Sequence, residues 1–152
     1  MNYSFLNKSK LTIALSTILL ITSCALKPIT SEYNFITTDL EKVELGNGKI
    51  LIYNGANILH KIDNTARLNI WIDNKPLGQI RPSEYVIINL KKGQYQFKAL
   101  HLDVVNMKSL HYVDIDKKTE IIKIKPNVTS NKLEITNELP KNFGKFKYAE
   151  KR

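Results

Sequence analysis

The side chains that could carry chemistry are three histidines, His60, His101 and His111, and a single cysteine, Cys24. The histidines show neither the H-x-H nor the H-E-x-x-H spacing of metal sites. His101 and Asp103 could form a ligand pair on one side of a strand, but no third ligand accompanies them, so both are interpreted as surface polar residues. The sequence has neither a G-x-S-x-G elbow nor a phosphate-binding glycine loop. We therefore expect a protein that is not an enzyme and has no cofactor or metal; a hydrolase is only a formal alternative.

Cys24 stands directly behind an apolar segment, residues 11–21, which follows a polar start with two lysines. A basic start, an apolar stretch of about 7 to 15 residues and small residues before a cleavage point describe a secretory signal. The sequence ITSC at 21–24 resembles the lipobox of bacterial lipoproteins, in which signal peptidase II cleaves before the cysteine and diacylglycerol is attached to its sulfur. The resemblance implies a signal peptide over residues 1–23 and lipidation of Cys24.

Two other interpretations of this segment are open. A transmembrane anchor needs roughly 20 predominantly apolar residues, and residues 11–21 are fewer and include Thr12, Ser16 and Thr17. Plain secretion would export an unpaired thiol to an oxidising compartment, which lipidation of Cys24 avoids. Two acyl chains already give stable membrane attachment. A lipid-anchored protein is therefore the favoured interpretation.

The residues after Cys24 bear on its location. In lipoproteins of Gram-negative bacteria, aspartate at the next position marks retention in the inner membrane, and this chain has Ala25 and Leu26 there. The resemblance therefore implies the outer membrane, with the protein facing the periplasm. Residues 24–44 are expected to be the lipidated N-terminus and a spacer, with a short helix near residues 38–45.

From residue 49 onward, apolar and polar residues alternate with the period of two that is typical of half-buried strands. Turn residues such as Asn54-Gly55 and Asp73-Asn74 separate the segments. Gly78 stands where a strand could bulge. The expected strands are residues 49–53, 68–73, 75–80, 84–90, 94–99, 109–114, 119–125 and 132–137. Short strands with frequent turns predict an all-β fold, a small antiparallel β-sandwich or barrel of about seven strands over residues 45–137.

The central strands support a family comparison. Residues 69–80, 83–85 and 90–95 resemble PEGA-type domains and a related family of short bacterial lipoproteins of uncharacterised function. Asp73-Asn74-Lys75 stands for the family's Asp-Gly-Lys, and Lys92-Gly93 for its Pro-Gly. The resemblance covers roughly residues 48–125. It implies a β-sandwich of transthyretin-like or carboxypeptidase-regulatory type and brings no catalytic residues with it.

The mature chain would be basic, with 21 Lys and Arg against 14 Asp and Glu after Lys8 and Lys10 leave with the signal, a formal charge of +7. Ten of these basic residues fall within residues 117–152, and residues 138–152 are expected to be a basic C-terminal tail. Export makes nucleic acid an improbable partner, and envelope polyanions such as peptidoglycan or lipopolysaccharide are the accessible ones. The candidate polyanion-binding residues are Lys141, Lys145 and Lys147. The other interpretation is a solvated, partly disordered terminus whose charge serves solubility.

Trp71 is the remaining candidate for binding. It is expected on the face opposite Leu68, Ile70 and Ile72, where it is either covered by the tail, through Phe143 or Phe146, or exposed as an anchor for a partner. The sequence therefore indicates a membrane-anchored envelope lipoprotein with a non-enzymatic binding or structural role, acting on another envelope protein or polymer. The alternative is a polyanion-binding module that acts through the basic C-terminal region.

Overall fold

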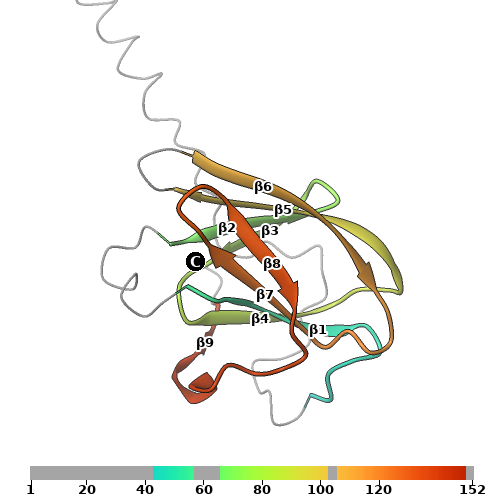
Figure 1. Cartoon of the computed structure of the whole chain (residues 1–152). Helices are drawn as coiled ribbons and strands as arrows, with labels where there is room; N and C mark the ends of the chain where they lie inside the picture. Colours follow the sequence, from blue (N-terminus) through green and yellow to red (C-terminus); the bar gives the residue numbers. More distant parts are fainter. Residues whose placement is uncertain (1–42, 57–65, 103–105, 150–152) are drawn as a thin grey trace, which may run out of the picture.

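Nine strands in the part of the chain that the structure describes form two β-sheets (Figure 1). The structure is a computed structural model and describes residues 43–56, 66–102 and 106–149. The predicted signal peptide, Cys24 and all but the end of the spacer lie outside these residues, as do His60 and Asp103.

The first sheet has five strands in the order β8-β7-β1-β4-β9. β1 pairs antiparallel with β4 on one side and parallel with β7 on the other. β8 is antiparallel to β7, and the two-residue β9 is parallel to β4. The bounds are β1 Lys49–Asn54, β4 Glu84–Asn89, β7 Ile121–Pro126, β8 Asn131–Ile135 and β9 Lys147–Tyr148.

The second sheet has four antiparallel strands in the order β3-β2-β5-β6. Asp73 and Asn74 join β2 to β3 with φ angles of 49° and 63°, as in the two-residue hairpin turn whose central residues both have positive φ. Gly78 has φ of 128°, and the β2–β3 register shifts opposite it, between Ile70 and Trp71. The bounds are β2 Leu68–Ile72, β3 Lys75–Ile80, β5 Gly93–Leu102 and β6 Asn106–Ile115.

The main core lies between the two sheets. In each strand, every second side chain points towards the other sheet. Ile50 and Ile52 of β1 therefore meet Ile70 of β2 and Phe97 of β5 in one apolar cluster. Burial of each such side chain contributes about 1.5 to 3 kcal/mol. The two sheets are therefore held face to face by mainly aliphatic packing around the buried ring of Phe97.

A polar link also joins the sheets, at the start of β8. The Asn131 Nδ2 donates to the carbonyls of Ala99 (3.1 Å) and Met107 (3.0 Å). Its Oδ1 is then the acceptor for His101 Nδ1 at 2.7 Å, and His111 Nε2 donates to the Asn131 carbonyl at 2.9 Å. His101 is only 4% exposed. Its interpretation as a surface residue was wrong, because a strand alternation does not reveal that β8 closes over this end of β5.

The all-β sandwich is confirmed. The predicted strands correspond to β1–β8, and the structure adds β9. The first sheet is mixed and not wholly antiparallel, because β7 and β9 each run parallel to a neighbour. Residues 138–149 are also continuous with the sandwich and not a separate tail, since β9 pairs with β4. A two-residue strand has no alternation from which a sequence could predict it.

Candidate binding surfaces

The outer face of the five-stranded sheet carries an aromatic cover formed by Phe143, Phe146 and Tyr148. The 3₁₀ turn η3, Phe143–Lys145, brings Phe143 and Phe146 to one side, because side chains three residues apart eclipse in this geometry. Their rings stack at 5.6 Å. Phe146 meets Tyr53 edge to face at 5.6 Å, and Phe143 lies 5.0 Å from Tyr85.

The three lysines of this C-terminal segment, Lys141, Lys145 and Lys147, are exposed. Lys141 and Lys145 line an open hollow of about 350 Å³ at the edge of the cover, and Lys123 of β7 lines it from the sheet. We call this the lysine hollow. Lys147 is exposed on β9 and lies outside it. Of the three tail lysines proposed from the sequence, the fold therefore brings two together and adds Lys123. The other lining residues are Tyr53, Gly55, Ala56, Ser83, Thr136, Glu138, Leu139, Pro140, Asn142 and Phe146.

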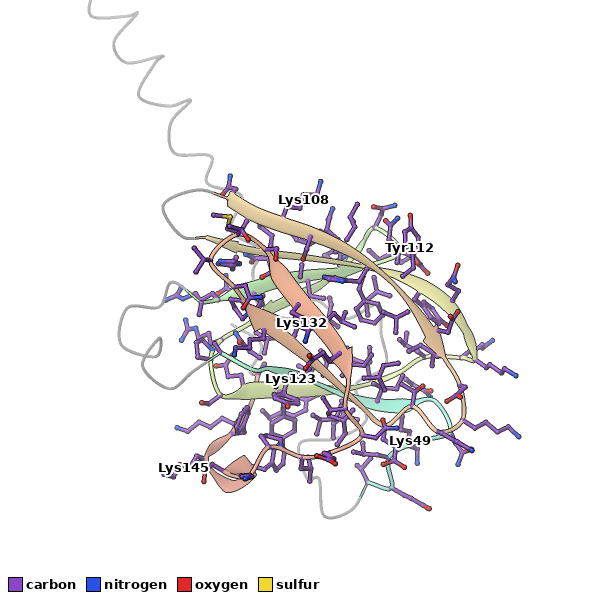
Figure 2. All side chains as sticks on the ribbon, viewed as in Figure 1. Lys49, Lys108, Tyr112, Lys123, Lys132 and Lys145 are labelled. Atoms are coloured by element: carbon purple, nitrogen blue, oxygen red, sulfur yellow. The ribbon has the colours of Figure 1, made fainter. Side chains whose placement is uncertain are left out.

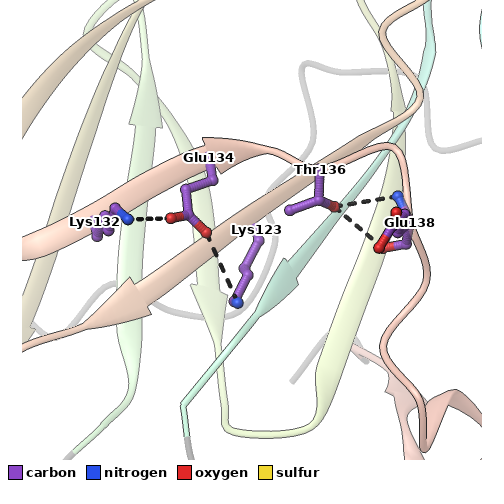
Figure 3. Close-up of polar contacts among 5 residues, drawn as sticks. All are labelled: Lys123, Lys132, Glu134, Thr136 and Glu138. Carbon is purple, nitrogen blue, oxygen red and sulfur yellow. Dashed lines mark hydrogen bonds and ion pairs between the residues drawn. The ribbon is translucent and has the colours of Figure 1, made fainter.

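Local hydrogen bonds shape one wall of the lysine hollow. The Thr136 Oγ1 donates to the Glu138 carbonyl at 3.1 Å and lies 3.4 Å from the Glu138 N–H (Figure 3). Burial raises the pKa of the Tyr53 hydroxyl, the charge of Glu134 raises it further, and a hydrogen bond with Thr136 opposes both. Tyr53 is therefore neutral at physiological pH and contributes a ring and a protonated hydroxyl to the wall.

Lys123 is held against this wall by its neighbours. Its Nζ lies 3.8 Å from Glu134 Oε2, and Glu134 also pairs with Lys132 (Figure 3). The hydrogen bond from Lys132 is the main reason that the pKa of Glu134 lies below its usual value. The stem of Lys123 crosses Gly55, where an added Cβ would come within 2.8 Å of Lys123 Cε. The small residue at 55 thus leaves the space that the lysine stem occupies.

A second hollow, of about 280 Å³, lies among the turns at the other end of β4. Its charged groups are Lys91, Lys92, Lys117 and Asp116, so it matches the lysine hollow in charge. The backbone N–H of Lys118, followed by the Thr119 hydroxyl, lowers the pKa of Asp116. The remaining lining residues are Asn47, Gly48, Asn89 and Leu90. This turn hollow has no aromatic wall.

Trp71 lies on the outer face of the four-stranded sheet, away from both hollows. The strand register sets Trp71 beside Pro76 on one side and Lys98 on the other. The Lys98 Nζ stands 4.3 Å from the centre of the indole ring, within the range of a cation–π contact. The expectation that Phe143 or Phe146 covers Trp71 was wrong, because both rings pack on the other sheet.

The same outer face displays two large side chains of β6. Leu110 is 52% exposed and Tyr112 is 70% exposed, and Lys108 and Tyr112 both point away from the other sheet (Figure 2). Gln96 Nε2 donates to the Tyr112 hydroxyl at 3.0 Å. We call Trp71, Lys98, Leu110 and Tyr112 the open face. Leu110 and Tyr112 were not proposed from the sequence, although their alternation with the buried Val113 placed them on the outer side.

Comparison with known protein families, with curated proteins and with solved structures finds no match to this chain. Within residues 43–56, 66–102 and 106–149, no three histidine, cysteine or acidic side chains are grouped so as to hold a metal ion. Nor does the described part of the chain contain a helix with the length and apolar character to span a membrane.

Proposed function

We propose that the protein is a lipid-anchored lipoprotein of the bacterial outer membrane that faces the periplasm and has a non-enzymatic binding role. The lipobox-like sequence at 21–24 and the short apolar segment before it support the anchor. Replacement Cys24→Ala is expected to abolish palmitate labelling and to release the protein from the membrane fraction. Labelling that persists in this variant would remove the basis for the anchor.

The open face is the observation that best supports a binding role. Leu110 and Tyr112 leave apolar surface exposed beside Lys98 and Lys108, and clustered exposed apolar side chains mark interaction sites. This apolar surface favours an envelope protein as the partner, because aromatic and aliphatic side chains are what the buried centre of a protein interface takes up.

The charges on the open face indicate which kind of side chain the partner presents to it. Lys98 and Lys108 stand on the outer side of the sheet, and the Asp114 carboxylate there accepts from Gln94 Nε2 at 3.2 Å. Complementary charge across an interface favours encounter and fixes register. We therefore expect the partner to offer an apolar patch bordered by acidic side chains.

Site-specific photo-crosslinking in intact cells tests the open face. A photoreactive phenylalanine at Tyr112 should give a discrete crosslinked product. The same group at Val128, which is 84% exposed in the β7–β8 turn, should give none. Addition of Leu110→Ser should remove the product from the Tyr112 probe. Equal crosslinking at both positions, or insensitivity to Leu110→Ser, would contradict a specific partner at this face.

The alternative function, polyanion binding through the C-terminal region, is supported by the lysine hollow, where Lys141 and Lys145 meet Lys123. Binding to purified peptidoglycan or lipopolysaccharide should then fall steeply between about 50 and 500 mM salt, because screening shortens the reach of exposed charges. Truncation after Pro140 would also remove the aromatic cover, so Lys→Gln substitutions are the sharper test. Salt-independent binding would argue against this alternative.

A further inference from the structure

We propose that the lysine hollow is a binding site for a phosphate ester, with the phosphate held by Lys123, Lys141 and Lys145. This inference deepens the polyanion-binding alternative and rests on it, and it is independent of the open face. The hollow is lined by elements far apart in the chain, β7 and the segment that follows β8, so the site exists only in the folded protein.

The charge of the hollow favours an anion. Three lysines line it and Glu138 is the one carboxylate among its lining residues. Glu134, which is not among the lining residues, pairs with Lys123. It also pairs with Lys132, so its single negative charge does not fully neutralise Lys123. The local field is therefore positive. An anion that enters the hollow is attracted by each ammonium group. Because the hollow is open to solvent, dissolved salt screens this attraction.

The cations of the hollow suit a phosphate. All three basic lining residues are lysines, and a lysine ammonium binds phosphate as a point charge. A tetrahedral phosphate has oxygens in several directions, and Asn142 and Ser83 add neutral polar groups to the lining. Groups approaching from different walls can thus contact different oxygens of one phosphate.

The remaining lining residues favour an ester over a bare ion. Phe146, Leu139 and Pro140 give the hollow an apolar side next to its lysines. Its volume of about 350 Å³ falls in the range of small-molecule sites, roughly 300 to 1,000 Å³. The carbon body of a glycerol phosphate or of a lipid headgroup can therefore lie on the apolar side while its phosphate meets the ammonium groups.

Calorimetric titration of the full-length, lipidated protein in uncharged maltoside micelles tests this site. Glycerol 3-phosphate should bind at least roughly tenfold more tightly than acetate, a difference of about 1.4 kcal/mol. Replacement of Lys123, Lys141 and Lys145 by Gln should weaken it by about tenfold or more. The matched control, Lys91, Lys92 and Lys117 to Gln in the turn hollow, removes the same charge and should change the affinity less than about twofold.

One variant should strengthen binding. Glu138→Gln removes the carboxylate from the lysine hollow and should tighten glycerol 3-phosphate by roughly two- to fivefold, since a like charge beside the ligand is lost. A loss of folding cannot produce such a gain. If the triple variant fails to fold, the single substitutions Lys141→Gln and Lys145→Gln, both at exposed positions, should each weaken binding by about twofold or more.

Several outcomes would overturn the inference: acetate binding as tightly as the ester, equal weakening by the two triple variants, or no effect of Glu138→Gln. Soluble dihexanoyl phosphatidylglycerol separates the two sources of the ester, since tighter binding than glycerol 3-phosphate indicates a lipid headgroup and equal binding a soluble ester. A protein that binds lipopolysaccharide but no phosphate ester would leave the polyanion alternative standing and remove this site. Binding of the ester without binding of lipopolysaccharide or peptidoglycan would keep this site and remove the polyanion alternative.

Discussion

The two sheets of this sandwich share one core but differ in their outer faces. The outer face of β1 and β4 in the five-stranded sheet is covered by the aromatic cover together with Val43 and Leu45. The residues buried beneath are Leu51, Tyr53, Tyr85 and Ile87. The outer face of the four-stranded sheet is open, and side chains as large as Tyr112 project from it. β1 and β4 of one sheet are therefore buried on both sides, whereas the outer side of the other sheet carries exposed side chains.

The difference is visible in the strands themselves. The four central residues of β1 and of β4 are all apolar and buried, as expected for strands covered on both faces. β6 alternates between exposed and more buried positions, as expected for a strand with one solvated face. The C-terminal segment therefore covers the outer face of one sheet, whereas large side chains stay exposed on the outer face of the other.

The largest effect is expected from removal of the aromatic cover. A chain ending at Pro140 loses Phe143, Phe146 and Tyr148 and exposes the apolar residues below them. The free energy of unfolding should fall by about 5 kcal/mol or more, because each Phe→Ala change in a core costs up to about 3 to 5 kcal/mol and these rings are partly buried. Denaturant unfolding measures it, with a chain ending at Ala149 as the control. Unchanged stability in the shorter chain would show that the cover does not stabilise the sheet.

The next largest effect should come from the link between the sheets. Asn131→Leu leaves the carbonyls of Ala99 and Met107 and the Nδ1 of His101 without their shared partner. A buried polar group left without a partner costs about 1 to 3 kcal/mol, so we expect a loss of about 3 kcal/mol in the free energy of unfolding. Asn127→Leu, at an exposed position of the preceding turn, is the control and should stay within about 0.5 kcal/mol. Equal losses from the two variants would contradict the role of Asn131.

Alkaline pH should destabilise the fold through Tyr53 on the covered face. Burial raises the pKa of Tyr53 above its ordinary value of 10.0. Above that value the unfolded chain releases this proton while the folded chain retains it, so the free energy of unfolding falls as pH rises towards the raised pKa. Below about pH 10 the contribution of Tyr53 to the free energy of unfolding is fully present.

Denaturant titrations between about pH 9 and 11.5 check the sign. Tyr53→Phe should make the stability fall less steeply than in the parent protein. A slope that does not respond to Tyr53→Phe would show that the buried hydroxyl does not govern the alkaline loss.

The smallest effect on stability is expected on the open face. Tyr112→Ser should change the free energy of unfolding by less than about 0.5 kcal/mol, because surface substitutions away from structural features stay within that range. Trp71→Ala should cost about 1 kcal/mol, since it removes the contact with Lys98. Thermal and denaturant unfolding measure both. A loss of several kcal/mol from Tyr112→Ser would mean that this face is structural.

Much of the fold follows from local patterns. The alternation around Leu68–Ile72 identified β2, and the turn chemistry of Asp73-Asn74 agreed with the positive φ angles found there. Gly78 was placed at a bulge and stands opposite a register shift. Such features depend on residues close in sequence, and a sequence displays them directly.

The candidate sites were predicted less well. Lys141 and Lys145 were singled out by charge alone, and nothing in the sequence placed Lys123 beside them. One of the two expectations for Trp71 was cover by an aromatic ring of the tail, whereas the side chain found over its ring is Lys98. Each error concerns a contact between residues of different strands, where register and topology decide which side chains meet.

The sequence by itself determined the class of the fold, the inward and outward sides of most strands and the hairpin turn, because these depend on neighbours along the chain. Tertiary structure alone decided that β7 and β9 run parallel to their neighbours, that His101 is buried by Asn131 and that one outer face is closed. Pairings between distant segments depend on the summed burial of the whole sandwich, and no single stretch of sequence contains that sum.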